Sequence, residues 1–159
     1  MELRADALRF VLAQGLPAVI EVSGRSMEPT IAKGQKVDVQ ALDDSTPLEV
    51  GDVVLVATGG DILLLHRVMA AFDERGARLV VHQGDARAST FAIAARRDVL
   101  ARVGARPIPA EPTLFRRRVL AVGGFLAARR LARTIGLADA ALVRRCAQVY
   151  RRLARAVSG

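Results

Sequence analysis

Residues 22–30 read Val-Ser-Gly-Arg-Ser-Met-Glu-Pro-Thr, and the rest of the chain is organised around this stretch. A run of strand type at residues 18–23 leads into it, and Gly24 permits a sharp turn. Pro29 fixes the direction in which the chain leaves, because its ring locks φ and restricts the preceding residue. The Ser26 hydroxyl is thereby held at a stiff corner, as an exposed nucleophile needs, although an ordinary turn has the same pattern.

The segments around this stretch predict an α+β domain that is mainly antiparallel sheet. A helix is expected over residues 3–14, because apolar residues recur there at helical spacing and Gly15 can end it. Short apolar runs separated by polar or glycine-containing turns follow at hairpin spacing, which favours a curled sheet or small barrel. The predicted strands cover residues 18–23, 36–40, 53–56, 62–69, 78–83 and 99–108.

A proline-rich segment divides the chain. Residues 107–112 read Pro-Ile-Pro-Ala-Glu-Pro, a stiff composition typical of linkers. We therefore expect a β domain with an N-terminal helix over residues 1–106, a linker over 107–113 and a basic helical tail over 114–159. The tail is predicted to form a helical hairpin, whose second helix runs from Asp139 to about Val157.

The net charge of +8 is concentrated in the tail. Residues 1–113 carry 13 Lys and Arg against 15 Asp and Glu, whereas residues 114–159 carry 11 Arg against one Asp. Such a tail can lie on an anionic membrane surface, or bind an acidic leader peptide, a protein or nucleic acid nonspecifically. It can equally be the solvated face of a helical hairpin. Nucleic acid is the least favoured partner, because the chain has one Tyr and no Trp for base stacking.

The composition also bears on compartment and cofactors. No run reaches the roughly 18–20 uncharged apolar residues that span a bilayer. Glu2 and Asp6 stand where a secretory signal would be basic, so a cytoplasmic protein, peripheral to the membrane at most, is expected. The single Cys146 excludes an internal disulfide, and two histidines among scattered carboxylates predict neither a metal site nor a cofactor.

A nucleophilic Ser26 requires a base, and His66 is the main candidate. It lies inside the apolar run 62–69, on the face of Leu64 and Val68 if that run is a strand. A buried histidine needs a partner, which can also be a neighbouring carbonyl with no catalytic role. His82 is the alternative base, and the two lysines, Lys33 and Lys36, are less well placed near an early turn.

Asp85 is the candidate third member. It ends the strand expected to pair with the one that carries His66, so its carboxylate can bond the imidazole and stabilise the imidazolium. A plain Gly-Asp turn at residues 84–85 is the competing interpretation.

Taken together, these motifs resemble the signal peptidase I and LexA-like superfamily of serine peptidases. The nucleophile box corresponds to Ser-Gly-Arg-Ser-Met-Glu-Pro-Thr at residues 23–30, and Gly-Asp-Val-Val at 51–54 resembles the box that follows it. His-Arg-Val at 66–68 matches the general-base position, and Gln-Gly-Asp at 83–85 matches the last box. The order and spacing agree across residues 18–106.

The resemblance implies a serine endopeptidase in which Ser26, His66 and Asp85 act through an acyl-enzyme. Histidine at position 66 is similar to the archaeal, endoplasmic-reticulum and sporulation-type branch, since many bacterial members have lysine there. Gly24 stands where Lys-type enzymes often have a second serine, so the Ser26 backbone N–H and an unidentified donor would form the oxyanion hole.

The implied substrate is a precursor protein that carries a leader or signal peptide. The membrane anchor usual in the family is not evident in residues 1–17, which favours a cytoplasmic precursor. Two alternatives remain open: a regulator resembling the self-cleaving repressors, and an inactive peptide-binding relative, each using the basic tail to bind nucleic acid or membrane.

Overall fold

The computed structural model describes residues 5–43, 45–58, 62–86, 90–104 and 108–134. The chain forms two compact units, Met1–Glu111 and Pro112–Gly159. The boundary between them lies inside the predicted linker, residues 107–113.

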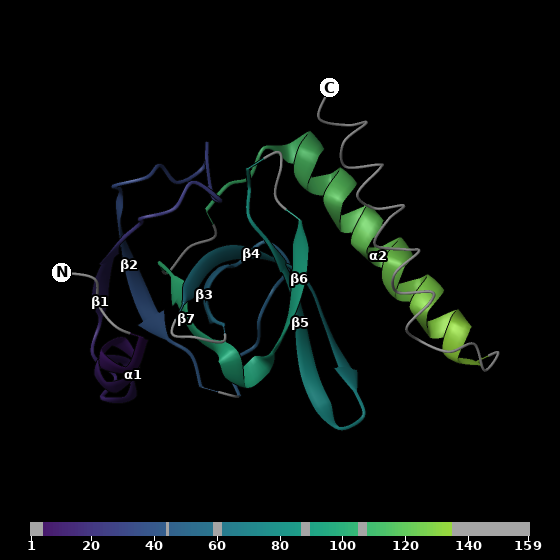
Figure 1. Ribbon diagram of the computed structural model, residues 1–159, viewed down its shortest axis with the longest axis horizontal. Helices are drawn as coiled ribbons and strands as arrows, with labels where there is room; N and C mark the ends of the chain where they lie inside the picture. Colours follow the sequence, from purple (N-terminus) through teal and green to yellow (C-terminus); the bar gives the residue numbers. More distant parts are fainter. Residues whose placement is uncertain (1–4, 44, 59–61, 87–89, 105–107, 135–159) are drawn as a thin grey trace. The chain divides into compact units, whose positions relative to one another are not determined.

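The described part of the first unit is an α+β fold with a curled, seven-stranded antiparallel sheet (Figure 1). The strand order across the sheet is β1-β2-β7-β3-β4-β5-β6. The elements are α1 (Ala5–Ala13), β1 (Ala18–Glu21), β2 (Lys36–Ala41), β3 (Val53–Ala57), β4 (Leu63–Glu74), β5 (Ala77–Gln83), β6 (Phe91–Ala95), the 3₁₀ turn η1 (Arg96–Asp98) and β7 (Val99–Val103).

Strand β7 joins two parts of the sheet, each of which is built from strands that are consecutive in the sequence. On one side it pairs with β2, Val39 lying opposite Val103, and on the other side with β3, Val54 lying opposite Arg102. The hairpin β1-β2 therefore connects to the β3-β4-β5-β6 meander, within the hydrogen-bonded sheet, through this last strand alone among the described strands.

Strand β4 is the long, bent centre of the meander. Its first half pairs with β3 and its second half with β5, and a register shift between Val68 and Ala70 interrupts the second ladder. A β-bulge of this kind bends the strand and increases its local twist, which contributes to the curling of the sheet.

Both faces of the sheet bury apolar side chains, so β3 is buried along its whole length. One cluster packs α1 against the sheet, with Leu8 of the helix fully buried. The second cluster lies on the other face of β3 and consists of Val54, Val56, Val68, Val80 and Val99. Helix α1 ends at Ala13, and Gly15 follows two residues later with a φ of +68°, which glycine adopts readily.

The predicted helix is confirmed over Ala5–Ala13, its first two predicted residues lying outside the described part of the chain, and the antiparallel hairpins are confirmed with differences at the strand ends. Strand β4 runs on to Glu74, and β7 stops at Val103 instead of residue 108. Strand β6 was not predicted. Its sequence, Phe-Ala-Ile-Ala-Ala, is too rich in alanine to give a strand signal, and it forms because β5 offers it a complete ladder.

The second unit begins with α2 (Pro112–Thr134). Pro112 is the first residue of the helix, where the missing N–H of proline costs nothing, so the helix starts inside the predicted linker. No helix in the described part of the chain has an uncharged apolar stretch long enough to cross a membrane. The second tail helix predicted from Asp139, and Cys146 within it, lie outside the described residues.

Candidate active site

Ser26 lies in the turn-rich segment between β1 and β2, held at both ends by the core. The next side chain, Met27, and Ile31 are fully buried against α1 and the sheet, while Ser26 is half-buried. The carbonyl of Ser26 accepts a 2.8 Å hydrogen bond from the N–H of Ala86, the residue after Asp85. Ser26 and Ala86, sixty residues apart in sequence, are therefore joined directly.

The Asp85 carboxylate is held by Arg67. Nε and one terminal nitrogen of the guanidinium donate to its two oxygens at 2.9 and 2.6 Å, the bidentate geometry of a strong ion pair. The other terminal nitrogen donates to the carbonyls of Gly51 and Ile108, each at 2.7 Å. Arg67 is 1% exposed, so this pair is shielded from water.

The Gly-Asp box at residues 51–52 fixes the entrance of β3 beside this pair. The N–H of Gly51 donates to the Val68 carbonyl at 2.9 Å, and the Asp52 carbonyl accepts from the Val68 N–H at 2.7 Å. Gly51 has a φ of +107°, a conformation that side chains disfavour. The two residues thus anchor β4 immediately after His66 and Arg67.

His66 and Arg67, being consecutive, point to opposite faces of β4. His66 lies opposite Val54 of β3, on the face of the second apolar cluster, as the alternation predicts. His82 of β5 lies opposite Val68, so the two histidines are diagonal neighbours on that face. Their Nδ1 atoms are 2.9 Å apart and their ring planes are inclined by 45°.

Burial and neighbouring charge act on the pKa values of the two imidazoles. Desolvation lowers the pKa of His66, and the Asp85 carboxylate opposes this shift by favouring the imidazolium. Desolvation, reinforced by the charge of His66, lowers the pKa of His82 to about 4. Of the two rings, His66 is therefore the one whose imidazolium a neighbouring carboxylate favours.

Two separate links involve the three predicted residues, and neither is a hydrogen bond of a simple triad. Ser26 is bound to Ala86 through its backbone, and the charge of Asp85 acts on His66. Among the described residues, however, the Asp85 oxygens are hydrogen-bonded to Arg67, and Nδ1 of His66 faces His82. The direct hydrogen bonds from Ser26 to His66 and from His66 to Asp85, and the oxyanion role of the Ser26 N–H, remain predictions.

Two contributors to this site were missed at the sequence level. The sequence motif assigns no role to Arg67, although a lone arginine in an apolar strand requires a buried acceptor. His82 was considered as a replacement for His66 and not as its partner. The separation of 16 residues across a hairpin was the available signal, since it can bring two side chains to one face.

Acidification is expected to weaken folding through His82. The ordinary pKa of 6.5 applies to the unfolded chain and a pKa of about 4 to the folded one, so protons bind the unfolded chain preferentially between these values. The free energy of unfolding should therefore fall by up to about 3 kcal/mol as the pH drops from about 6.5 to about 4. Urea titrations at intervals across this range measure the slope.

The control for this prediction is His82→Phe. Carboxylates that titrate in the same range act equally on both proteins, so the difference between the two slopes reports on the histidine pair, namely the loss of His82 and the accompanying change in the pKa of His66. Identical slopes would contradict a buried, neutral His82.

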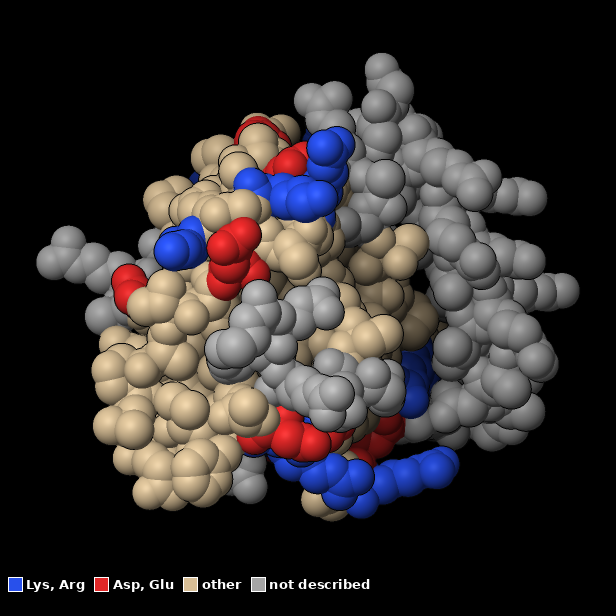
Figure 2. All heavy atoms as spheres, turned by 60° about the vertical axis from the view of Figure 1, so that its left-hand side comes forward, with Lys and Arg blue, Asp and Glu red and all other residues tan. Residues whose placement is uncertain are grey.

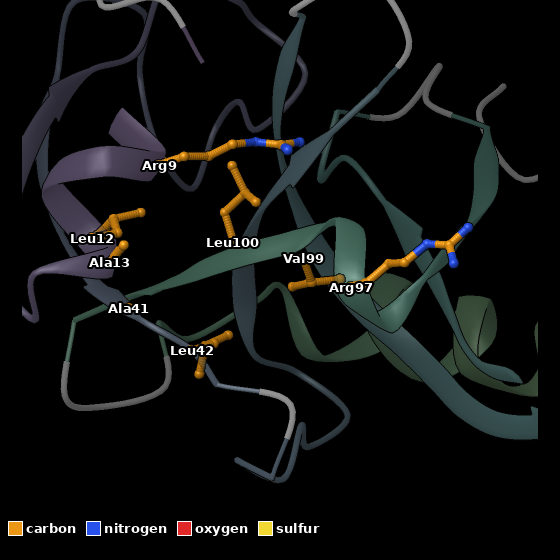
Figure 3. A pocket seen from close by; sticks show the side chains of 8 residues that line it. All are labelled: Arg9, Leu12, Ala13, Ala41, Leu42, Arg97, Val99 and Leu100. Carbon is orange, nitrogen blue, oxygen red and sulfur yellow. The ribbon is translucent and has the colours of Figure 1, made fainter. Parts of the chain in front are cut away.

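A separate pocket of about 200 Å³ lies away from these residues, between α1 and the strands β2 and β7 (Figure 3). Its apolar lining includes Leu12, Leu42 and Leu100, with Arg9 and Arg97 at its borders. The Arg97 guanidinium points away from the leucines. None of Ser26, His66 and Asp85 lines this pocket.

Surface charge gives no further indication of a site. Figure 2 shows acidic and basic side chains interspersed over the described surface of one face, with a broad area that carries neither. This agrees with the near balance of charges in residues 1–113. The described residues also contain no cluster of three or more His, Cys, Asp and Glu side chains that could hold a metal ion.

No family model matches the sequence, and comparisons with curated proteins and with solved structures returned no match.

Proposed function

We propose that this chain is a serine endopeptidase resembling the signal peptidase I and LexA-like superfamily, which removes a leader or signal peptide from a precursor protein. Ser26 is the nucleophile, His66 the general base, and Asp85 stabilises the imidazolium through its charge. The observation that carries the proposal is the bond from Ala86 to Ser26, because it ties the nucleophile segment to the residue whose carboxylate acts on His66.

The proposed reaction follows from these positions. As the Ser26 oxygen attacks the peptide carbonyl, its proton moves to His66, and the Ser26 backbone N–H with a second donor holds the oxyanion. His66 then passes the proton to the leaving amine. A water molecule deprotonated by His66 hydrolyses the acyl-enzyme and restores the serine.

The buried ion pair supports this assignment by supplying rigidity. Arg67 connects Asp85, which follows β5, to the backbone at Gly51 and Ile108. The carboxylate is therefore held in place beside β4, the strand that carries His66. A carboxylate held in place favours the imidazolium of His66 without having to reorganise, while the guanidinium of Arg67 offsets part of its charge.

The test of the proposal is covalent labelling with a fluorophosphonate, analysed by mass spectrometry of intact and digested protein. We expect one adduct on Ser26 in the wild type, and a labelling rate about 10²–10⁴-fold lower in His66→Ala, because an unassisted serine is barely ionised. A folded wild-type protein that is not labelled, or a His66→Ala variant labelled at the wild-type rate, would contradict the mechanism.

The resemblance also implies small residues on the acyl side of the scissile bond, which a peptide-library profile would measure. Docking of the arginine-rich tail on an anionic membrane remains part of the proposal. Helix α2 exposes Leu120 and Leu131 together with the exposed arginines Arg116, Arg117 and Arg130, a combination suited to an anionic interface.

A further inference from the structure

The hydrogen bond between the two buried imidazoles determines whether His66 can act as a base. Nitrogen atoms 2.9 Å apart must be a donor and an acceptor, so one of the two Nδ1 atoms carries a hydrogen and the other is bare. If His82 donates, neutral His66 carries its hydrogen on Nε2 and cannot accept a proton there. If His66 donates, its Nε2 is bare and can act as a base.

Burial distinguishes the roles of the two rings. His82 is 2% exposed and His66 is 8% exposed, so His66 is the less deeply buried of the two rings. The Asp85 charge favours the cation on His66, whereas the charge of His66 disfavours a second cation on His82. His82 consequently stays neutral and can accept a hydrogen bond while His66 is protonated.

Asp85 is poorly arranged to orient the imidazole itself. Both of its oxygens already accept hydrogen bonds from Arg67, and its effect on His66 is electrostatic. The position next to His66 Nδ1 that an orienting group would occupy is taken by His82.

We propose that His82 is the positioning residue for the general base: its Nδ1 accepts the Nδ1–H of His66 and so presents the bare Nε2 of His66 to the Ser26 hydroxyl. This inference rests on the proposed function. During acylation the serine proton moves to Nε2 of His66, and the Nδ1–H bond to His82 is retained. When the proton leaves for the departing amine, both rings return to their starting tautomers, and His82 gains or loses no proton.

The charged groups around His66 determine the expected pH response. Asp85 approaches from the end of β5 and is paired with Arg67 of β4, whereas the neighbour on β3, Val54, is uncharged. Replacing His82 should therefore move the pKa of His66 in a direction set by the new side chain. His82→Phe removes the acceptor and should lower that pKa, and His82→Asp adds a carboxylate at the same position and should raise it.

The kinetic test measures the rate of fluorophosphonate labelling of Ser26 against pH. His82→Phe should slow labelling at neutral pH by about 100-fold or more, with little change in its concentration dependence, and shift the acid limb to lower pH. His82→Asp should retain labelling within about tenfold of wild type, with the acid limb at higher pH. Unchanged rates in His82→Phe, or limbs that shift in the same direction, would overturn the proposal, because a packing role predicts no opposite shifts.

A second measurement does not depend on activity. The chain has two histidines, so ¹⁵N NMR of the imidazoles can be assigned with His66→Asn and His82→Asn. We expect His66 to carry hydrogen on Nδ1 and His82 on Nε2, and the reverse would overturn the inference. If the wild type is not labelled but the NMR result holds, the peptidase proposal fails while the hydrogen-bond assignment stands. Labelling lost in His82→Asn but retained in His66→Asn would instead make His82 the base.

Discussion

Ser26→Ala is expected to abolish peptide cleavage and leave the fold intact. Removal of the nucleophile should lower kcat/KM by at least about 10⁴-fold, since neither the base nor the oxyanion donors can form an acyl-enzyme without it. Alanine retains the backbone carbonyl that accepts the Ala86 N–H, so the turn keeps its link to the segment that contains Asp85. Cleavage is measured with a fluorogenic peptide library, and folding by circular dichroism and urea titration.

The matched control is Ser23→Ala, an exposed serine three residues earlier in the same turn. Wild-type rates are expected for this variant. Activity close to wild type in Ser26→Ala would show that the nucleophile lies elsewhere, and an equal loss in both variants would point to the conformation of the turn instead of the hydroxyl.

Breaking the Arg67–Asp85 pair is expected to have the largest effect on stability. Asp85→Asn leaves a guanidinium charge without a counterion at 1% exposure, and should lower the free energy of unfolding by about 3–5 kcal/mol. Arg67→Met should cost at least as much, because the carbonyls of Gly51 and Ile108 also lose their donor. Urea unfolding at neutral pH measures both losses.

Two further variants show whether burial is the cause. The double substitution Arg67→Met with Asp85→Leu removes both charges and should recover part of the loss, since no unpaired ion remains. Arg25→Ala disrupts the exposed Arg25–Glu28 pair, whose closest atoms are 4.0 Å apart, and should change stability by less than about 1 kcal/mol. Comparable losses for the exposed and the buried pair would contradict this account.

Much of the fold could be predicted from the sequence because its hairpins are local. Glycine-containing turns and apolar runs identified β2 to β5, and Gly15 marked the end of α1. The strand order could not be predicted in the same way. The pairing of β7 with both β2 and β3 joins residues about 45 to 65 apart in sequence, and no local pattern encodes such contacts. Strand β6 could not be predicted for another reason. Its alanines carry little strand preference, so pairing with β5 decides its conformation.

In the candidate site, too, the local features could be predicted and the contacts between strands could not. Motif spacing indicated Ser26, His66 and Asp85, and alternation correctly placed His66 on the face of Val68. Hydrogen-bond partners depend on which side chains meet across strands. Asp85 lies diagonally from Arg67, and His82 diagonally from His66, so a one-residue difference in register decides which pair forms. The sequence suggested Asp85 as the partner of His66. In the sheet, Asp85 is bonded to Arg67 instead.

The position of β7 has a consequence for the order in which the protein can mature on the ribosome. The half of the sheet that carries Ser26 and the half that carries His66 are both synthesised before the strand that bonds them together. A nascent chain that has emerged as far as η1 therefore lacks the element that completes the sheet. The bond between Ser26 and Ala86 can form earlier, but the sheet that supports the proposed nucleophile and base should be complete only after Val103 has left the exit tunnel.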